Sequence, residues 1–129
     1  MKSLKLYITE ALHVNRNTKI TEYNYRPKTT DELRKLVRKL IKERGENADL
    51  NDIDVSEITD MSYLFYDTKF NGDISNWKVS NVEDMPYMFY DSKFNGDISN
   101  WDVSNVKYMT GMFVKSPLEK NPPKWYKKQ

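Results

Sequence analysis

Residues 73–96 read DISNWKVSNVEDMPYMFYDSKFNG, and residues 97–120 read DISNWDVSNVKYMTGMFVKSPLEK. A weaker copy, DLNDIDVSEITDMSYLFYDTKFNG, occupies residues 49–72, so the chain contains three consecutive repeats with a period of 24 residues. A tandem repeat of this length indicates one structural unit per period, because a single unit cannot bury its own apolar side chains and must stack on its neighbours. The repeats therefore decide the fold.

Within each repeat the spacing of the apolar residues changes. In the third copy they fall first at Ile98, Trp101 and Val103, which is the i, i+3, i+5 spacing of a leucine-rich-repeat strand. From Val106 onward they fall at i, i+3, i+6 and i+7, which is a helical spacing. A strand and a short helix in every unit imply parallel strands joined by right-handed crossovers. The predicted fold class is α/β: a short right-handed parallel β/α solenoid, leucine-rich-repeat-like, with an N-terminal helical cap.

The segments that flank the repeats are predicted to be caps. Thr29 and Glu32 have the spacing of a helix capping box, and Gly45 is a helix stop signal after an amphipathic pattern. The predicted organisation is a leader helix in residues 1–12, a strand and helix cap in 13–48, the repeats in 49–120 and a C-terminal cap in 121–129. One tryptophan recurs with the period, so we expect a stacked column of Trp77, Trp101 and Trp125.

The repeat also resembles a known family. The phrase W-[DK]-V-S-N-V-x-x-M-x-x-M-F, at residues 77–89 and 101–113, is similar to the short tandem repeat of BspA-like leucine-rich-repeat proteins. Such repeats occur in bacterial surface proteins and in proteins of bacteriophages and mollicutes. The resemblance covers residues 49–125 and implies a leucine-rich-repeat-like solenoid that binds proteins or mediates adhesion. This chain has only three full repeats, where surface members carry many.

The composition limits the chemistry available to the chain. The 129 residues include no cysteine and a single histidine, His13, and they contain no phosphate loop, nucleophile elbow or metal-ligand motif. We therefore predict that the protein is not an enzyme and that it uses no cofactor and no metal. Lys5 and Glu10 interrupt the apolar positions near the N-terminus, so we expect no secretion by a signal peptide. No apolar run is long enough to cross a membrane, and a monomer is expected.

Charge is segregated along the chain. Residues 1–46 contain 12 Lys and Arg against 6 Asp and Glu, residues 47–114 contain 4 against 12, and residues 115–129 contain 5 against 1. Because both ends of the chain are basic, binding to nucleic acid is kept as an alternative hypothesis. The lysines are not interleaved with aromatic residues in the manner of a base-stacking surface, so a protein partner is the preferred prediction.

The outward-facing side of the predicted sheet is the candidate protein-binding face. Repeat proteins commonly dock partners on this side. The residues that flank the second apolar position of each predicted strand are polar, and they are Asp52, Asp54, Asn76, Lys78, Asn100 and Asp102.

The N-terminal segment supports a narrower hypothesis. Ile8, Glu10 and Ala11 resemble the (Leu/Ile)-x-Glu↓(Ala/Gly/Ser) site that prohead proteases of tailed bacteriophages cleave, and the segment resembles a capsid-targeting leader of phage internal proteins. An ordinary first helix is the alternative for these residues. The leading functional hypothesis is a non-enzymatic protein-binding repeat module, encoded by a phage and packaged in the capsid, found in the virion or the host cytoplasm. The alternatives are a bacterial surface or adhesion repeat protein and a nucleic-acid-associated protein that uses its basic ends.

Overall fold

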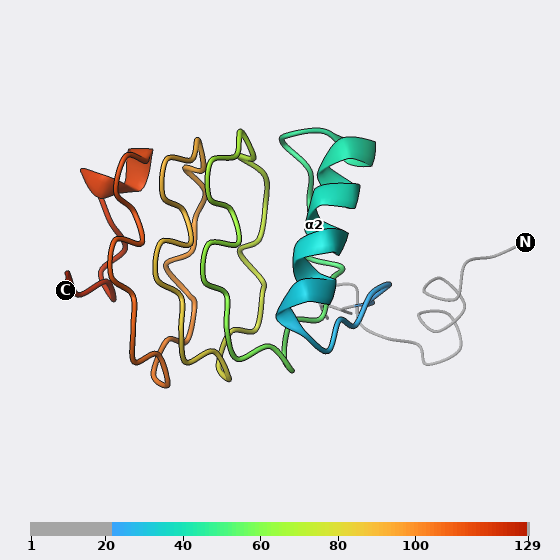
Figure 1. The fold of residues 1–129 in the computed structure, drawn as a ribbon, viewed down its shortest axis with the longest axis horizontal. Coiled ribbons are helices and arrows are strands. Elements are labelled where there is room, and N and C mark those ends of the chain that lie inside the picture. The colour runs from blue at the N-terminus through green and yellow to red at the C-terminus, as the bar shows by residue number, and fades with distance from the viewer. Residues whose placement is uncertain (1–21, 129) are drawn as a thin grey trace, which may run out of the picture.

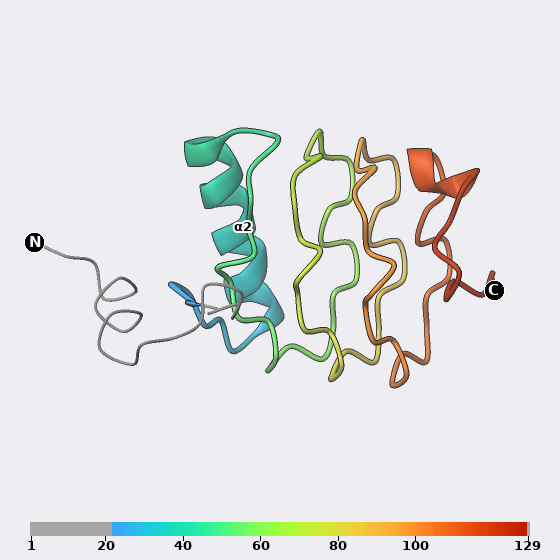
Figure 2. The ribbon, with the colours of Figure 1, turned by 180° about the vertical axis from the view of Figure 1, so that it is seen from behind.

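The computed structural model describes residues 22–128. They form one α-helix, α2 (Thr30–Arg44), a series of 24-residue coils and a short 3-10 helix, η1 (Pro117–Glu119). Figure 1 shows α2 at one end, the coils lying side by side, and η1 at the opposite end. The view from behind in Figure 2 gives the same order, so the repeats follow one another in space as they do in sequence.

Helix α2 begins and ends where its sequence predicts. Thr29 Oγ1 accepts a hydrogen bond from the backbone N–H of Glu32 at 3.1 Å, and this bond caps the first turn. The Glu32 carboxylate accepts from the N–H of Lys28 at 2.9 Å, one residue before the donor that a capping box predicts. At the other end Gly45, with a φ of 98°, donates its N–H to the carbonyl of Ile41 at 2.7 Å. The apolar face joins the common core through Leu33, Val37 and Leu40.

The predicted fold class is wrong. Residues 22–128 contain no β-strand or sheet, and the repeats within them contain no α-helix, so the chain is not an α/β solenoid. Successive coils are joined instead by isolated parallel bridges between equivalent residues of neighbouring repeats, namely Asp49–Asp73, Asp60–Asp84 and Asp84–Tyr108. In the described part of the predicted N-terminal strand, only a single bridge from Tyr25 to Ile53 forms. No helix in the described part of the chain has the length and apolar character needed to span a membrane.

The segment predicted as a strand consists of turns. In the second repeat the carboxylate of Asp73 accepts from the N–H of Ser75 at 2.9 Å, and the N–H of Trp77 donates to the carbonyl of Ile74 at 3.1 Å. An aspartate side chain that binds the backbone two residues further on favours a turn over an extended strand. Ile74 and Trp77 are nevertheless buried. The spacing therefore identifies the buried side chains correctly but predicts the wrong backbone.

The segment predicted as a helix is held by bonds between repeats. In the second repeat alternate N–H groups donate to carbonyls of the third repeat at 2.8 to 2.9 Å, in the pairs Met85–Tyr108, Tyr87–Thr110 and Phe89–Met112. In an α-helix these N–H groups would bind carbonyls four residues earlier in the same segment. Tyr87 also has a φ of 54°, in the left-handed region, which interrupts a right-handed helix. The equivalent residues Tyr63 and Gly111 have φ values of 60° and 64°, so all three repeats share this backbone.

Aromatic columns fill the interior. Nearly parallel rings with centroids 5.5 and 5.7 Å apart form the column of Phe65, Phe89 and Phe113. The predicted tryptophan column is confirmed, with centroid distances of 6.5 and 6.4 Å along Trp77, Trp101 and Trp125. Each indole N–H donates to a carbonyl of the preceding repeat, which is that of Leu50, Ile74 or Ile98. Each tryptophan thus satisfies its polar atom and ties two repeats together.

Candidate functional site

Four of the six residues of the predicted binding face line one surface depression. They are Asn76, Lys78, Asn100 and Asp102, and the depression has a volume of about 360 Å³. The first two belong to the second repeat and the last two to the third, at equivalent positions. The 24-residue period therefore brings matching polar side chains together on the surface. The role of this depression in binding stays a prediction.

The other two residues of that face, Asp52 and Asp54, are engaged within the molecule. Two guanidinium nitrogens of Arg44 lie 2.9 Å each from the Asp52 carboxylate oxygens, and Asn24 Nδ2 lies at 2.8 Å. The hydrogen bond from Arg44 is the largest cause that lowers the pKa of Asp52, and partial burial opposes it. The Asp54 carboxylate accepts from the N–H of Ser56 at 3.0 Å. Asp52 thus ties the end of α2 to the first repeat.

Asp102 is exposed but also makes a local bond. Its carboxylate accepts from the N–H of Ser104 at 3.0 Å, and hydrogen bonds from Ser104 lower the pKa of Asp102. Within residues 22–128 no ion pair joins Asp102 to Lys78. Lys78 therefore remains an exposed cation beside the depression.

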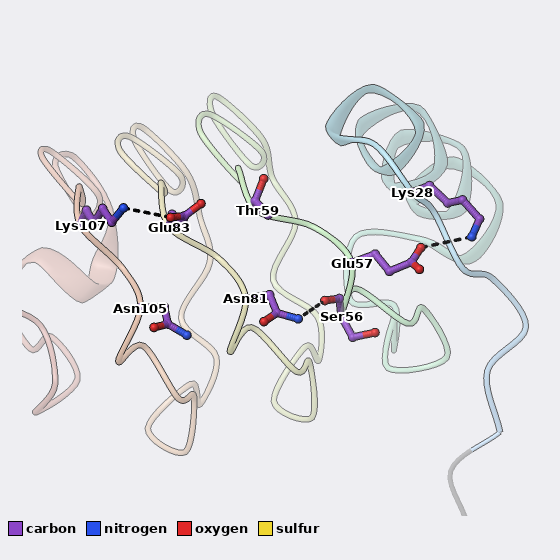
Figure 3. A pocket seen from close by; sticks show the side chains of 8 residues that line it. All are labelled: Lys28, Ser56, Glu57, Thr59, Asn81, Glu83, Asn105 and Lys107. Atoms are coloured by element: carbon purple, nitrogen blue, oxygen red, sulfur yellow. Dashed lines mark hydrogen bonds and ion pairs between the residues drawn. The ribbon is translucent and has the colours of Figure 1, made fainter.

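A second hollow, of about 790 Å³, is a polar groove that Figure 3 shows from close by. It is lined by Lys28, Ser56, Glu57, Thr59, Asn81, Glu83, Asn105 and Lys107. Its charges pair with one another, since Lys28 Nζ lies 3.3 Å from Glu57 and Lys107 Nζ lies 3.0 Å from Glu83. Asn81 Nδ2 donates to the carbonyl of Ser56 at 2.7 Å. The groove is therefore a self-complementary polar surface whose charges are neutralised in pairs.

The repeats also carry an aromatic surface that the sequence reasoning missed. We call it the tyrosine ladder, and it consists of Tyr63, Tyr66, Tyr87 and Tyr90. Rings of neighbouring repeats stack, with centroids 5.2 Å apart for Tyr63–Tyr87 and 5.7 Å apart for Tyr66–Tyr90. Within each repeat the two rings meet edge to face, at 5.7 and 5.8 Å. Four rings thus support one another over two repeats.

The tyrosine ladder reaches solvent at a backbone position that is unusual for tyrosine. Tyr63 is 49% exposed and Tyr66 is 47% exposed. Tyr63 and Tyr87 adopt the left-handed backbone conformation, which costs a residue with a side chain about 1–2 kcal/mol. In the third repeat the same position holds Gly111, the residue that adopts this conformation most readily. The sequence signal was available, because tyrosines recur with the period at positions outside the apolar columns.

Charges surround the tyrosine ladder asymmetrically. Residues 59–67 and 83–91, which carry its rings, contain acidic residues and no Lys or Arg. Among them Asp67 and Asp91 are exposed. The equivalent position in the third repeat is Lys115, whose ammonium lies 5.7 Å from the centroid of the Tyr90 ring. The chain therefore places one of its own cations against a ring of the tyrosine ladder.

The predicted leader cleavage motif of Ile8, Glu10 and Ala11 lies outside the described residues, and so does His13. Within residues 22–128 no three His, Cys, Asp or Glu side chains gather in an arrangement that could hold a metal ion.

Comparisons with known proteins identify the family of the chain. Residues 32–129 match the family model described as "Mycoplasma protein of unknown function, DUF285". No curated protein and no solved structure matches the chain. The family match begins within α2 and extends over all three repeats, and it fits the resemblance of those repeats to BspA-like proteins. The chain therefore belongs to the DUF285 family of Mycoplasma proteins of unknown function.

Proposed function

We propose that this chain is a non-enzymatic protein-binding repeat module whose binding surface is the tyrosine ladder. The observation that carries the proposal is Tyr63, which is exposed on a left-handed backbone at the position where the third repeat has Gly111. A residue held in a costly conformation suggests a role beyond folding. Gly111 keeps the same backbone without a side chain and leaves room for the ring of Tyr87, so this backbone does not itself require a tyrosine. Tyr63 and Tyr87 are therefore explained better by what they present to a partner.

The chemistry of the ladder suits a protein partner. Tyrosine offers a large, rigid ring and a polar hydroxyl, and it is enriched among the residues that dominate binding energy at protein interfaces. Stacking on neighbouring rings fixes the side chains before binding, which lowers the entropic cost of association. The polar depression at Asn76 and Lys78 has no comparable exposed ring, because Trp77 in its lining is buried in the core.

The alternatives receive less support from the described residues. A nucleic acid would bring phosphates against the acidic segments that carry the ladder, which is electrostatically unfavourable. A surface or adhesion protein would also bind through a protein interface, so it differs in location more than in chemistry. Packaging in a phage capsid is a finer proposal that rests on Ile8, Glu10 and Ala11 alone. N-terminal peptide mass spectrometry of virion-derived protein tests it, and a chain that begins at Met1 would argue against it.

The double variant Tyr63→Gly/Tyr66→Ser tests the proposed function. Partners captured from a lysate by the wild-type chain are identified, purified and measured against both chains by calorimetry. We expect the double variant to remain folded and to lose at least about tenfold in affinity, because tyrosines at the centre of an interface contribute 2 kcal/mol or more. The control variant Asn76→Ser/Asn100→Ser alters the polar depression and should bind normally. Equal affinity of wild type and double variant would refute the proposal.

A further inference from the structure

The tyrosine ladder carries a further inference about the chemical class of its partner, which rests on the proposed function. We infer that the ladder binds a basic peptide segment, with Lys or Arg side chains lying against the tyrosine rings and facing the carboxylates of Asp67 and Asp91. The inference stands on three features of the described residues: the stacked rings, the exposed acidic positions beside them, and the lysine that already contacts one ring.

The first step concerns the rings. The face of an aromatic ring is electron-rich and attracts ammonium and guanidinium groups. Tyr66 and Tyr90 stack with an interplanar angle of 15°, and Lys115 Nζ lies 5.7 Å from the Tyr90 centroid. This distance is within the range at which cation–π attraction operates, which is about 6 Å. The rings of the ladder can therefore bind a cation, and the contact of Lys115 with Tyr90 is an example within the chain.

The second step concerns the acidic positions. Asp67, Asp91 and Lys115 occupy the same place in successive repeats. In the third repeat this position holds Lys115, which provides a cation from within the chain. In the first two repeats it holds an aspartate, so the position provides no cation and exposes a carboxylate. Within the described residues, Asp67 and Asp91 have no ion pair. A basic side chain from a partner would supply the charge that Lys115 supplies in the third repeat.

The third step concerns the wider field. Segments 59–67 and 83–91 contribute Asp60, Asp67, Glu83, Asp84 and Asp91 and no basic residue. Lys107 pairs with Glu83 at 3.0 Å, and the guanidinium of Arg34 donates to the carbonyl of Ser62 at 2.9 Å. With Lys69, Lys93 and Lys115 these cations balance the carboxylates of the two segments in number. The attraction for a basic partner therefore comes from the exposed carboxylates of Asp67 and Asp91, which make no ion pair within the described residues.

The test uses the full chain and three synthetic peptides of equal length. The first contains Lys and Arg among Gly and Ser residues, the second replaces its basic residues with Glu, and the third replaces them with Gln. Binding is measured by NMR chemical shifts and by calorimetry at two salt concentrations. We expect the basic peptide to shift the tyrosine resonances and to weaken as salt rises, and the other two to leave these resonances unchanged.

Two variants and a matched control locate the interaction. Asp67→Asn/Asp91→Asn should weaken the basic peptide about fivefold, because it removes two exposed charge pairs. Tyr63→Gly, which copies the residue at Gly111, should also weaken it about fivefold, because it removes a ring face. The control Asp49→Asn/Asp97→Asn makes the same charge change at exposed positions of another column and should bind like the wild type.

Each remaining outcome overturns the inference in a recognisable way. Equal binding of the basic and Gln peptides, or no loss in Asp67→Asn/Asp91→Asn, would show that charge does not select the partner. If an identified partner then still depends on Tyr63 and Tyr66, the proposed function stands and only the basic partner is wrong. If no partner depends on Tyr63 and Tyr66 for binding, both the proposed function and the basic partner are wrong. Binding of a single-stranded oligonucleotide to the ladder, or dimerisation of the protein alone through it, would also replace the basic peptide as occupant.

Discussion

The phenylalanine column and the tyrosine ladder are built by the same 24-residue step, but they meet different requirements. Phe65, Phe89 and Phe113 are fully buried and continue through all three repeats. In the ladder Tyr63 and Tyr66 are about half exposed, and the ladder stops after two repeats, where Gly111 replaces the next tyrosine. An interruption in the interior column would leave a cavity, whereas one on the surface leaves none. The comparison separates aromatic residues that the fold requires from those that it tolerates.

The largest effect should come from opening the interior column. Phe89 stacks on Phe65 and Phe113 in the middle repeat, so Phe89→Ala removes contacts on both sides of the ring. We expect a loss of about 3–5 kcal/mol in the free energy of unfolding, measured by urea denaturation. Tyr66→Ala, which removes an exposed ring of similar size, should cost about 1 kcal/mol or less. Similar losses for the two variants would remove the distinction between column and ladder.

The glycines that join the repeats should show the next largest effect. A Cβ atom added at Gly72 would lie 1.9 Å from the backbone carbonyl oxygen of Ala48, and one added at Gly96 would lie 3.2 Å from that of Gly72. Backbone atoms cannot move as easily as side chains. Gly72→Ala should therefore cost about 2–3 kcal/mol and Gly96→Ala less, in the same denaturation assay. The reverse order would mean that the first junction is not the tighter one.

A smaller effect concerns the contact between α2 and the first repeat. The Arg44 hydrogen bond lowers the pKa of Asp52 in the folded state, so the carboxylate stabilises the fold above its unfolded pKa. That contribution, about 1 kcal/mol or less for a partly exposed pair, should disappear as the pH falls through the folded pKa. Asp52→Asn should therefore be less stable than wild type near neutral pH and equally stable in strong acid. In a double-mutant cycle with Arg44→Met the two losses should not add.

The smallest effect is expected at the ladder itself. Tyr63→Gly relieves a left-handed backbone and removes a stacked ring, and these changes offset each other. We expect the free energy of unfolding to change by less than about 1 kcal/mol. Tyr63→Ala is the matched control, because it removes the ring and keeps the backbone strain, so it should be the less stable of the two. A large loss in Tyr63→Gly would assign the ladder to the fold.

The sequence predicted the period, helix α2 and the tryptophan column, because each depends on a signal that is local or exactly repeated. Thr29 and Gly45 mark the helix ends by their own hydrogen-bonding and backbone preferences. The strands and helices of the repeats could not be predicted in the same way. Apolar spacing reports which side chains are buried, and turns bury Ile74 and Trp77 as well as a strand would.

The candidate surfaces show the same limit. The sequence correctly predicted that Asn76 and Asn100 lie on one surface, because the period alone places them side by side. Asp52 was assigned to the same face, but Arg44 of α2 binds it, and sequence spacing within the repeats does not reveal a contact from outside them. The ladder was missed because the left-handed φ of Tyr63 and Tyr87 turns a segment with helical spacing into one that presents both tyrosines.

The bonds between repeats have a consequence for the length of the molecule. Each tryptophan indole bonds a residue 27 positions earlier, and each bridge within the repeats joins residues 24 positions apart. Adding another repeat would therefore leave the typical sequence separation of contacts unchanged, so loop closure would become no slower as the chain grew. A second copy of residues 73–96, inserted after the first, would add two tyrosines and copies of the two exposed aspartates, Asp73 and Asp91. With the tyrosine ladder as the proposed binding surface, duplication alone would raise the valency of the molecule for a repetitive partner.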